Sequence, residues 1–179
     1  MDNKNTRIIF ILRERHKGTI YMGSRTDYAF FIMNTEEEEN VITKVDLENT
    51  VSLAGALMKD DTFLFLGCTD ATVRVFSLKE DPKKPQREYH IEVHKEVTCL
   101  KAIDTNILLC GQIEGYIQLI DTDSKLKVGE FQLVYDVDET KADIYDFVPV
   151  QRQGHYAVGT RQGLFIISIN RVKESEWDF

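Results

Sequence analysis

Residues 63–78 read FLFLGCTDATVRVFSL, and this stretch decides the fold. Four apolar residues, 63–66, precede a polar turn over residues 67–71. In the second half, 73–78, apolar and polar residues alternate. An apolar run, a polar turn and an alternating run are typical of a β-hairpin. The stretch therefore predicts two antiparallel strands joined by a tight turn.

The chain repeats this hairpin three more times. The related stretches are TIYMGSRTDYAFFIMN around Gly23, ILLCGQIEGYIQLIDT around Gly111 and YAVGTRQGLFIISIN around Gly159. With Gly67 included, the four glycines lie 44, 44 and 48 residues apart. A repeat of this length that contains only strands points to a β-propeller, in which each repeat forms one blade.

Each repeat contains an inner strand, the hairpin and an outer strand. No long stretch has apolar residues at helical spacing, which disfavours helix-rich and βαβ folds. We predict an all-β fold: one β-propeller domain over residues 1–179, with roughly four four-stranded antiparallel blades that form a partial ring or half-propeller. The blades are expected at about 6–47, 50–93, 96–135 and 143–179, and the tail, 171–179, contains one strand-like piece.

Composition limits the class of protein. A chain of 179 residues fits one domain with a core of its own. Its 30 acidic and 22 basic residues give a net charge of −8. That balance disfavours a nucleic-acid or anionic-membrane surface, which needs clustered Lys and Arg. We therefore expect neither nucleic acid nor membrane among its partners.

The N-terminal sequence and the cysteines bear on location. The apolar run near the N-terminus is too short for a signal peptide or a membrane span. Cys68, Cys99 and Cys110 are odd in number and lack metal-ligand spacing. Small buried thiols in a reducing compartment account for them. The sequence thus predicts a cytoplasmic, intracellular protein.

Residues 66–78, LGCTDATVRVFSL, resemble the blade signature of WD-repeat propellers. Asp70 falls on the turn-Asp position of that signature, and Phe76 falls where the family has Trp. In the third repeat, the turn is Glu114-Gly115 and Ile120-Asp121 takes the place of the Trp-Asp pair. Residues 94–98, HKEVT, resemble the Gly-His turn of the family.

The resemblance implies a set of structural residues rather than a chemical site. In the family, the His, the turn Asp and the Trp position belong to a hydrogen-bonded network within one blade. Here His94 is expected to pair with Glu114 of the same repeat, and repeats one and four lack an acidic turn residue except for Asp27. The structural turn and blade residues are Gly23, Gly67, Asp70, Phe76, His94, Gly111, Glu114, Gly115, Asp121, Gly159 and Gly163.

The number of repeats is small for this family. WD-type rings usually have about seven blades, so four repeats imply an incomplete ring. A second copy or further blades would then complete it, because an open ring exposes apolar strand faces and an unpaired edge. The alternative is a closed four-bladed ring like that of hemopexin-like domains, which are secreted and joined end to end by a disulfide.

No catalytic, cofactor or metal site is predicted. The sequence has no Gly-x-Ser-x-Gly, no phosphate-binding Gly-rich loop and no His-Glu-x-x-His. The sharpest alternative is an acidic segment with Asp136, Asp138, Glu139, Asp143 and Asp146. It lacks the mid-loop Gly and the Glu at the twelfth position of an EF-hand loop. We interpret it as a solvated blade connection that could dock a basic partner.

The sequence therefore predicts a non-catalytic protein–protein interaction scaffold of WD-repeat type. Propellers bind partners with their faces and their blade-connecting loops. The candidate contacts are Arg25, Asp27, Lys95, Asp136, Asp138, Glu139, Arg161 and Gln162. The alternative is a regulatory propeller in a larger enzyme or signalling protein, for example one attached to a kinase, or a propeller hydrolase. That alternative requires carboxylates or histidines that converge on the central axis.

Overall fold

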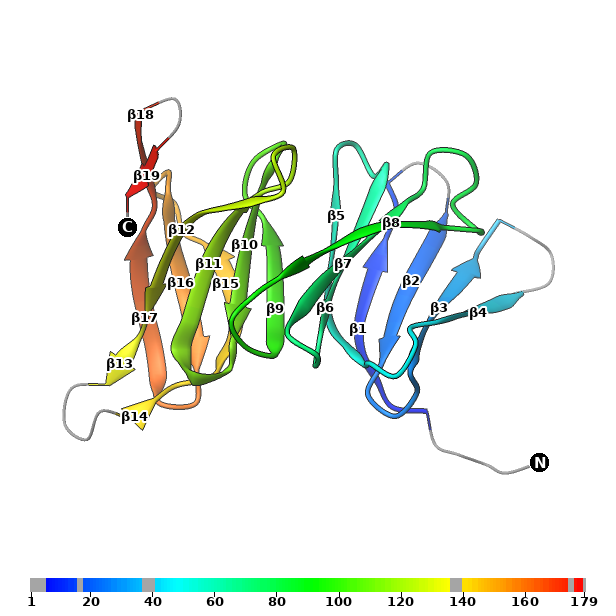
Figure 1. The fold of residues 1–179 in the computed structure, drawn as a ribbon, viewed down its shortest axis with the longest axis horizontal. Helices are drawn as coiled ribbons and strands as arrows, with labels where there is room; N and C mark the ends of the chain where they lie inside the picture. The colour runs from blue at the N-terminus through cyan, green and yellow to red at the C-terminus, as the bar shows by residue number, and fades with distance from the viewer. Residues whose placement is uncertain (1–5, 16–17, 37–40, 136–139, 174–175, 179) are drawn as a thin grey trace.

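The computed structural model describes residues 6–15, 18–36, 41–135, 140–173 and 176–178. Strands dominate this part of the chain and form four antiparallel sheets of three or four strands, which follow one another along the sequence, and two short hairpins (Figure 1). The four sheets are arranged as the blades of a β-propeller, which confirms the predicted all-β fold.

The first three blades each have four strands, hydrogen-bonded in chain order. Blade one contains β1 (Ile8–Arg13), β2 (Thr19–Ser24), β3 (Ala29–Asn34) and β4 (Ile42–Asp46). Blade two contains β5 (Ser52–Met58), β6 (Phe63–Cys68), β7 (Thr72–Ser77) and β8 (Gln86–Glu92). Blade three contains β9 (Val97–Ala102), β10 (Ile107–Gln112), β11 (Tyr116–Asp121) and β12 (Leu126–Gln132), with the 3-10 turn η1 (Ile113–Gly115) between β10 and β11.

Blade four has three hydrogen-bonded strands. They are β15 (Ile144–Pro149), β16 (His155–Thr160) and β17 (Gly163–Ser168), preceded by a short hairpin of β13 (Val134–Tyr135) and β14 (Thr140–Lys141). The tail forms a hairpin of β18 (Asn170–Lys173) and β19 (Glu176–Asp178), instead of the one strand-like piece expected. Between β17 and β18, the buried Ile169 donates its N–H to the Gly154 carbonyl at 2.7 Å, and the chain leaves the sheet there.

Apolar side chains fill the spaces between neighbouring blades. Between blades one and two, the rings of Phe30 and Phe76 meet edge to face with centroids 5.2 Å apart. Between blades three and four, Leu109 and Ile117 pack with Phe147. Each blade thus buries its faces against its neighbours, since a single sheet cannot cover both of its own faces.

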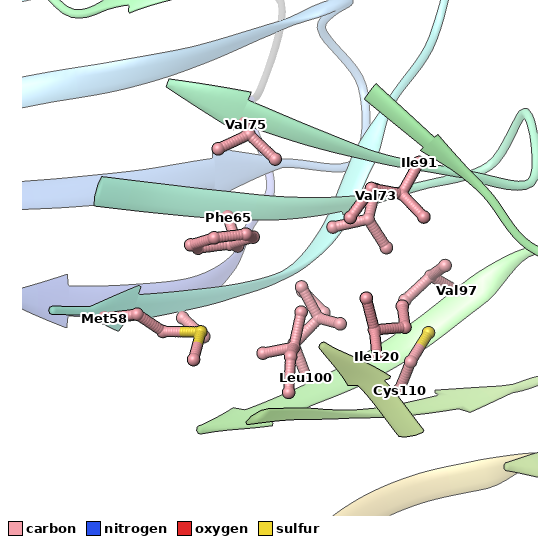
Figure 2. Close-up of a cluster of buried hydrophobic side chains, with 12 residues drawn as sticks. Met58, Phe65, Val73, Val75, Ile91, Val97, Leu100, Cys110 and Ile120 are labelled. Carbon is pink, nitrogen blue, oxygen red and sulfur yellow. The ribbon is translucent and has the colours of Figure 1, made fainter. Parts of the chain in front are cut away.

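The cluster between blades two and three shows this packing in detail (Figure 2). Blade two contributes Met58, Phe65, Val73, Val75 and Ile91, and blade three contributes Val97, Leu100, Cys110 and Ile120. The buried residues on β6 and β7 belong to the stretch 63–78 that predicted the fold. That stretch therefore forms the face on which the next blade packs.

All three cysteines are buried free thiols, as predicted. Burial raises the pKa of Cys68 to about 12. It also raises the pKa of Cys99 and of Cys110 above the ordinary thiol value. The thiols are therefore neutral at pH 7, and they act as small apolar side chains in the core.

Two of the repeated glycines, Gly67 and Gly111, lie where the next blade comes close. A Cβ on Gly67 would overlap Cγ1 of Val97, the first residue of β9 in blade three. A Cβ on Gly111 would lie 2.7 Å from Cγ2 of Ile144, the first residue of β15 in blade four. Whereas Gly23 is covered by Phe10 of its own blade, at these two junctions the glycine therefore makes room for the first inner-strand residue of the following blade. We call this glycine the seat and that residue the knob.

The four blades form an arc, the partial ring that the repeat count predicted. The inner strands β1, β5, β9 and β15 pack against one another in this order. Blades one and four lie at the two ends of the molecule (Figure 1). Large apolar side chains on both end blades are exposed, including Ile11 on β1 and Ile166 on β17. Among the described residues, no helix is long or apolar enough to cross a membrane.

Candidate functional site

A β-bulge recurs in every inner strand. The pairing register shifts between Ile8 and Phe10 in β1, between Ser52 and Ala54 in β5, and between Ile144 and Asp146 in β15; in β9 the shift falls at its pairing with Gly111 and Gln112. The residues skipped by the pairing are Ile9, Leu53, Thr98 and Tyr145, one in each blade. A bulge bends the strand locally and redirects a side chain.

All four bulge residues line one cavity of about 680 Å³. The complete lining is Ile9, Arg25, Val51, Leu53, Thr69, Glu96, Thr98, Ile113, Asp143 and Tyr145. Because every blade contributes its bulge residue, the blades turn about this cavity, which lies at the end where the inner strands begin. We call it the central cavity.

The other lining residues occupy two further positions of the repeat. Arg25, Thr69 and Ile113 belong to the turn that follows the second strand of blades one, two and three. Each turn is tied to the residue before its inner strand by a backbone hydrogen bond. The bonds run from Arg25 N to Arg7 O (2.9 Å), from Thr69 N to Val51 O (3.0 Å) and from Ile113 N to Glu96 O (3.1 Å). The rim of the cavity is therefore held by repeated main-chain contacts.

The charged groups in the lining are Arg25, Glu96 and Asp143. Burial raises the pKa of Glu96, the nearby Arg25 opposes this, and the negative charge of Asp143 adds to it. Asp143 Oδ1 accepts a hydrogen bond from the Glu114 N–H at 3.0 Å. In the part of the chain that the structure describes, no group of three or more His, Cys, Asp or Glu could hold a metal ion. A guanidinium and two carboxylates suit the site to ion pairs and hydrogen bonds with a polar partner.

Two of the predicted partner contacts lie at the central cavity or beside it. Arg25 lines the cavity and is exposed. Lys95 precedes the lining residue Glu96, and its N–H donates to Gln112 Oε1 at 2.6 Å. The Lys95 Nζ atom forms an ion pair with Glu114 Oε1 at 3.1 Å. The structure thus brings Arg25 and Lys95 to the side of the molecule on which the inner strands begin.

The other predicted contacts lie elsewhere. Asp27 accepts a hydrogen bond from Ser24 Oγ at 2.7 Å, which lowers its pKa, and it lines a separate cavity of about 340 Å³ on blade one. Arg161 is exposed in the β16–β17 turn, at the position that Arg25 occupies in blade one. The Gln162 N–H donates to Thr160 Oγ1 in the same turn, at 3.2 Å. Asp136, Asp138 and Glu139 lie outside the described residues.

Asp70 lies in the β6–β7 turn and holds a buried arginine. It accepts hydrogen bonds from Thr72 Oγ1 at 2.6 Å and from Arg74 Nη2 at 2.9 Å. Arg74 is buried and also donates to the carbonyl of Leu47 in blade one. Burial alone would raise the pKa of Asp70, but these hydrogen bonds outweigh it and the pKa lies below its usual value. The geometry gives Asp70 a bracing contact within the blade.

The expected pair of His94 with Glu114 is wrong. His94 Nε2 lies 2.7 Å from Glu130 Oε2, and the His94 ring lies against Tyr116 with centroids 5.4 Å apart. Glu114 pairs with Lys95 instead. The reason is the sheet register, which places Glu130 of β12 opposite Gln118 and brings its carboxylate to His94.

Glu130 is the centre of this polar cluster. Its Oε2 atom accepts hydrogen bonds from Lys127 at 2.8 Å and from Gln118 at 3.1 Å. These hydrogen bonds, that of Lys127 first, lower the pKa of Glu130 to about 2. The cluster joins the outer strand of blade three to the turn before β9.

Three further residues that were predicted as turn residues shape the backbone of their own turns. Gly115 has φ +76°, and a Cβ there would overlap the Leu133 carbonyl, so no other residue fits this position without strain. Asp121 Oδ1 accepts from the Asp123 N–H at 2.8 Å in the β11–β12 turn. Gly163 begins β17 with φ +149°.

Sequence reasoning missed most of the central cavity. Two signals could have found part of it: Ile9 and Leu53 lie one repeat apart, and Arg25, Thr69 and Ile113 share the spacing of 44 residues. Thr98 and Tyr145 depart from that spacing. Their place in the lining depends on bulges, which the apolar pattern does not reveal.

The sequence matches no protein-family model, and a search of curated proteins finds no relative. The fold class therefore rests on the structure, which is a four-bladed β-propeller arrangement. The WD-repeat type remains a resemblance in residues 66–78 and 94–98.

Proposed function

We propose that this protein is a non-catalytic protein–protein interaction scaffold of WD-repeat type, which binds a partner at the rim of the central cavity. One observation carries the proposal: all four repeats direct their bulge residue into the same cavity. A surface built once per blade from a rigid frame is suited to binding, because its side chains are ordered before the partner arrives.

The chemistry of the rim favours a polypeptide partner. The lining combines apolar Ile9, Leu53 and Tyr145 with the charged Arg25 and Glu96. Apolar and aromatic contacts with a few charged groups are what protein interfaces use at their centre and rim. Arg25 is the side chain best placed to contribute, because it is exposed and always charged.

The test is capture of protein partners on the tagged chain after brief cross-linking, with quantification by mass spectrometry. The informative variant is Arg25→Glu, since its backbone hydrogen bond to Arg7 does not involve the side chain. The matched control is Arg152→Glu, an exposed arginine in the β15–β16 turn. We expect wild type and control to recover the same partner and Arg25→Glu to recover at least about tenfold less, which corresponds to about 1.4 kcal/mol.

Equal recovery by Arg25→Glu and wild type would contradict binding at the central cavity. Turnover of a small molecule by the isolated chain would contradict the non-catalytic assignment. Circular dichroism of each variant, identical to that of wild type, shows that the comparison is made between folded proteins.

A further inference from the structure

The knob and the seat meet at two junctions, between blades two and three and between blades three and four, whereas Gly23 of blade one is covered by Phe10 of its own blade. The knob is the first residue of the inner strand, which pairs with the residue after the seat glycine: Val97 with Gln112 in blade three and Ile144 with Thr160 in blade four. Both knobs are fully buried on the seat of the preceding blade. The pairing of Ile8 with Ser24 makes Ile8 the knob of blade one.

The two ends of the arc each lack one half of this contact. Gly159 is the seat of blade four, and no atom of the described residues lies within 4 Å of the position that its Cβ would take. Ile8 is the knob of blade one, and 39% of its surface is exposed. The chain therefore carries an empty seat at one end and an unseated knob at the other.

The outward faces of blade four and blade one, around Gly159 and Ile8, both expose apolar side chains. On blade two, Val73 and Val75 are fully buried against blade three. The same register positions of blade four are Leu164 and Ile166, which are 72% and 60% exposed. On blade one, Ile11 lies on the face that points away from blade two and is 63% exposed.

The net charges of the two outward faces are opposite. On blade one, the register places Arg13, Lys44 and the acidic Asp46 on the outward face, so that the cations outnumber the acid there. On blade four, the exposed Asp146 is opposite Gly159. Opposite charges on two faces favour their association and fix its register.

We propose that a second copy of this chain completes the ring. Blade one of one copy stacks on blade four of the other, with Ile8 seated on Gly159. Because the four blades turn about one cavity, the second copy continues that turn and returns its own blade four to blade one of the first. The two copies are then joined by two identical contacts around a two-fold axis.

The area available is sufficient for such a pair. The three strands of blade four have six residues each. With strands about 4.8 Å apart and a rise of about 3.3 Å per residue, one such face covers roughly 290 Å². Two contacts with two faces each bury roughly 1,100 Å² as flat sheet, which passes the lower bound of about 1,000 Å² for a biological interface.

The test is the mass of the chain by size-exclusion chromatography with light scattering at micromolar concentration. Wild type is expected at twice the 20.7 kDa of one chain. Gly159→Leu has space in the single chain but blocks the seat, so it is expected at the mass of one chain. Ile8→Asp is expected to do the same.

Two controls keep the test specific. Leu126→Asp replaces an exposed apolar residue on β12, outside both faces, and is expected to leave the dimer intact. Arg25→Glu is also expected to keep the mass of wild type, so failure of the partner-binding proposal is distinguishable from failure of this one. A wild-type monomer, an open series of larger masses, or a Gly159→Leu protein that folds and still dimerises would overturn the proposal.

Discussion

Gly67 in blade two and Gly159 in blade four occupy the same place in the same hairpin, yet their surroundings differ. Val97 fills the space above Gly67, whereas the described part of the chain offers nothing to fill the space above Gly159. The hairpin forms in both blades, with Gly67 opposite Val73 and Gly159 opposite Leu164. The comparison shows that the next blade covers Gly67, and that the hairpin with Gly159 forms although no described residue covers that glycine.

The same contrast holds for the side chains beside the two glycines. Phe65 and Val75 face each other across β6 and β7 and are buried by blade three. Their counterparts in blade four, Ala157 and Ile166, lie at the open end of the arc. An apolar strand face is thus part of the core in one blade and a docking surface in the other, with no difference in strand pattern.

The largest expected effect comes from the core of blade two. Phe65→Ala removes a buried ring and leaves a cavity, so we expect it to lower the free energy of unfolding by about 3–5 kcal/mol. Ile166→Ala in blade four is expected to change it by less than about 0.5 kcal/mol. Urea denaturation at low protein concentration, where the chain is monomeric, measures both. Similar losses for the two variants would mean that the end face is buried within a single chain.

The next largest effect on the free energy of unfolding comes from substitution of the two seat glycines, Gly67 and Gly159. Gly67→Leu forces a side chain into the space of Val97, and we expect a loss of about 3 kcal/mol from overpacking. Gly159→Leu meets open space and is expected within about 0.5 kcal/mol of wild type. The same denaturation experiment compares them. A tolerated Gly67→Leu would contradict the knob-and-seat contact.

Substitution of Asp70, the carboxylate in the β6–β7 turn, is expected to have a smaller effect on the free energy of unfolding. Asp70→Ala removes the partner of the buried Arg74 guanidinium, and we expect a loss of about 2 kcal/mol. The counterpart in blade four is Gln162, whose Oε1 is buried without a hydrogen-bond partner in the described residues. Gln162→Ala is expected to be neutral within about 0.5 kcal/mol. Thermal unfolding distinguishes the two, and equal shifts would contradict a bracing contact specific to Asp70.

The smallest effect concerns Glu130 on β12. This strand is the fourth strand of blade three, whereas the sheet of blade four has only three strands. Its pKa in the folded protein is about 2, below the ordinary 4.5, so its contribution is present above pH 4.5 and is lost as the pH falls toward 2. We expect Glu130→Gln to cost less than about 1 kcal/mol at pH 7, because the site is exposed, and less than that at pH 2, where the carboxylate of the folded protein is about half protonated. A difference between Glu130→Gln and wild type that is undiminished at pH 2 would contradict this assignment.

Much of the fold could be predicted from the sequence. The alternation and glycine spacing of residues 63–78 and their relatives fixed the strands, because each depends on local contacts within one repeat. The tail could not be predicted in the same way. The polar residues of β18 lack an alternating pattern, and the strand forms through its pairing with β19.

Less of the candidate site could be predicted. Arg25 was found because it lies in a turn, and turns are defined by local sequence. Thr98 and Tyr145 enter the central cavity through bulges in the pairing of each inner strand with the second strand of its blade. The partner of His94 depends on the register between β11 and β12, a non-local contact, so the sequence suggested Glu114 where the structure has Glu130.

The most direct test of the knob-and-seat contact between copies is a mixed disulfide. Ile8→Cys and Gly159→Cys are prepared as separate proteins, mixed under mild oxidation and examined by non-reducing electrophoresis. The three native cysteines are buried, so the introduced thiols are the accessible ones. We predict a covalent dimer that forms rapidly in the mixture and far more slowly in a control mixture of Leu126→Cys with Gly159→Cys. A mixture of Ile8→Cys and Gly159→Cys that cross-links no faster than the control would contradict the contact.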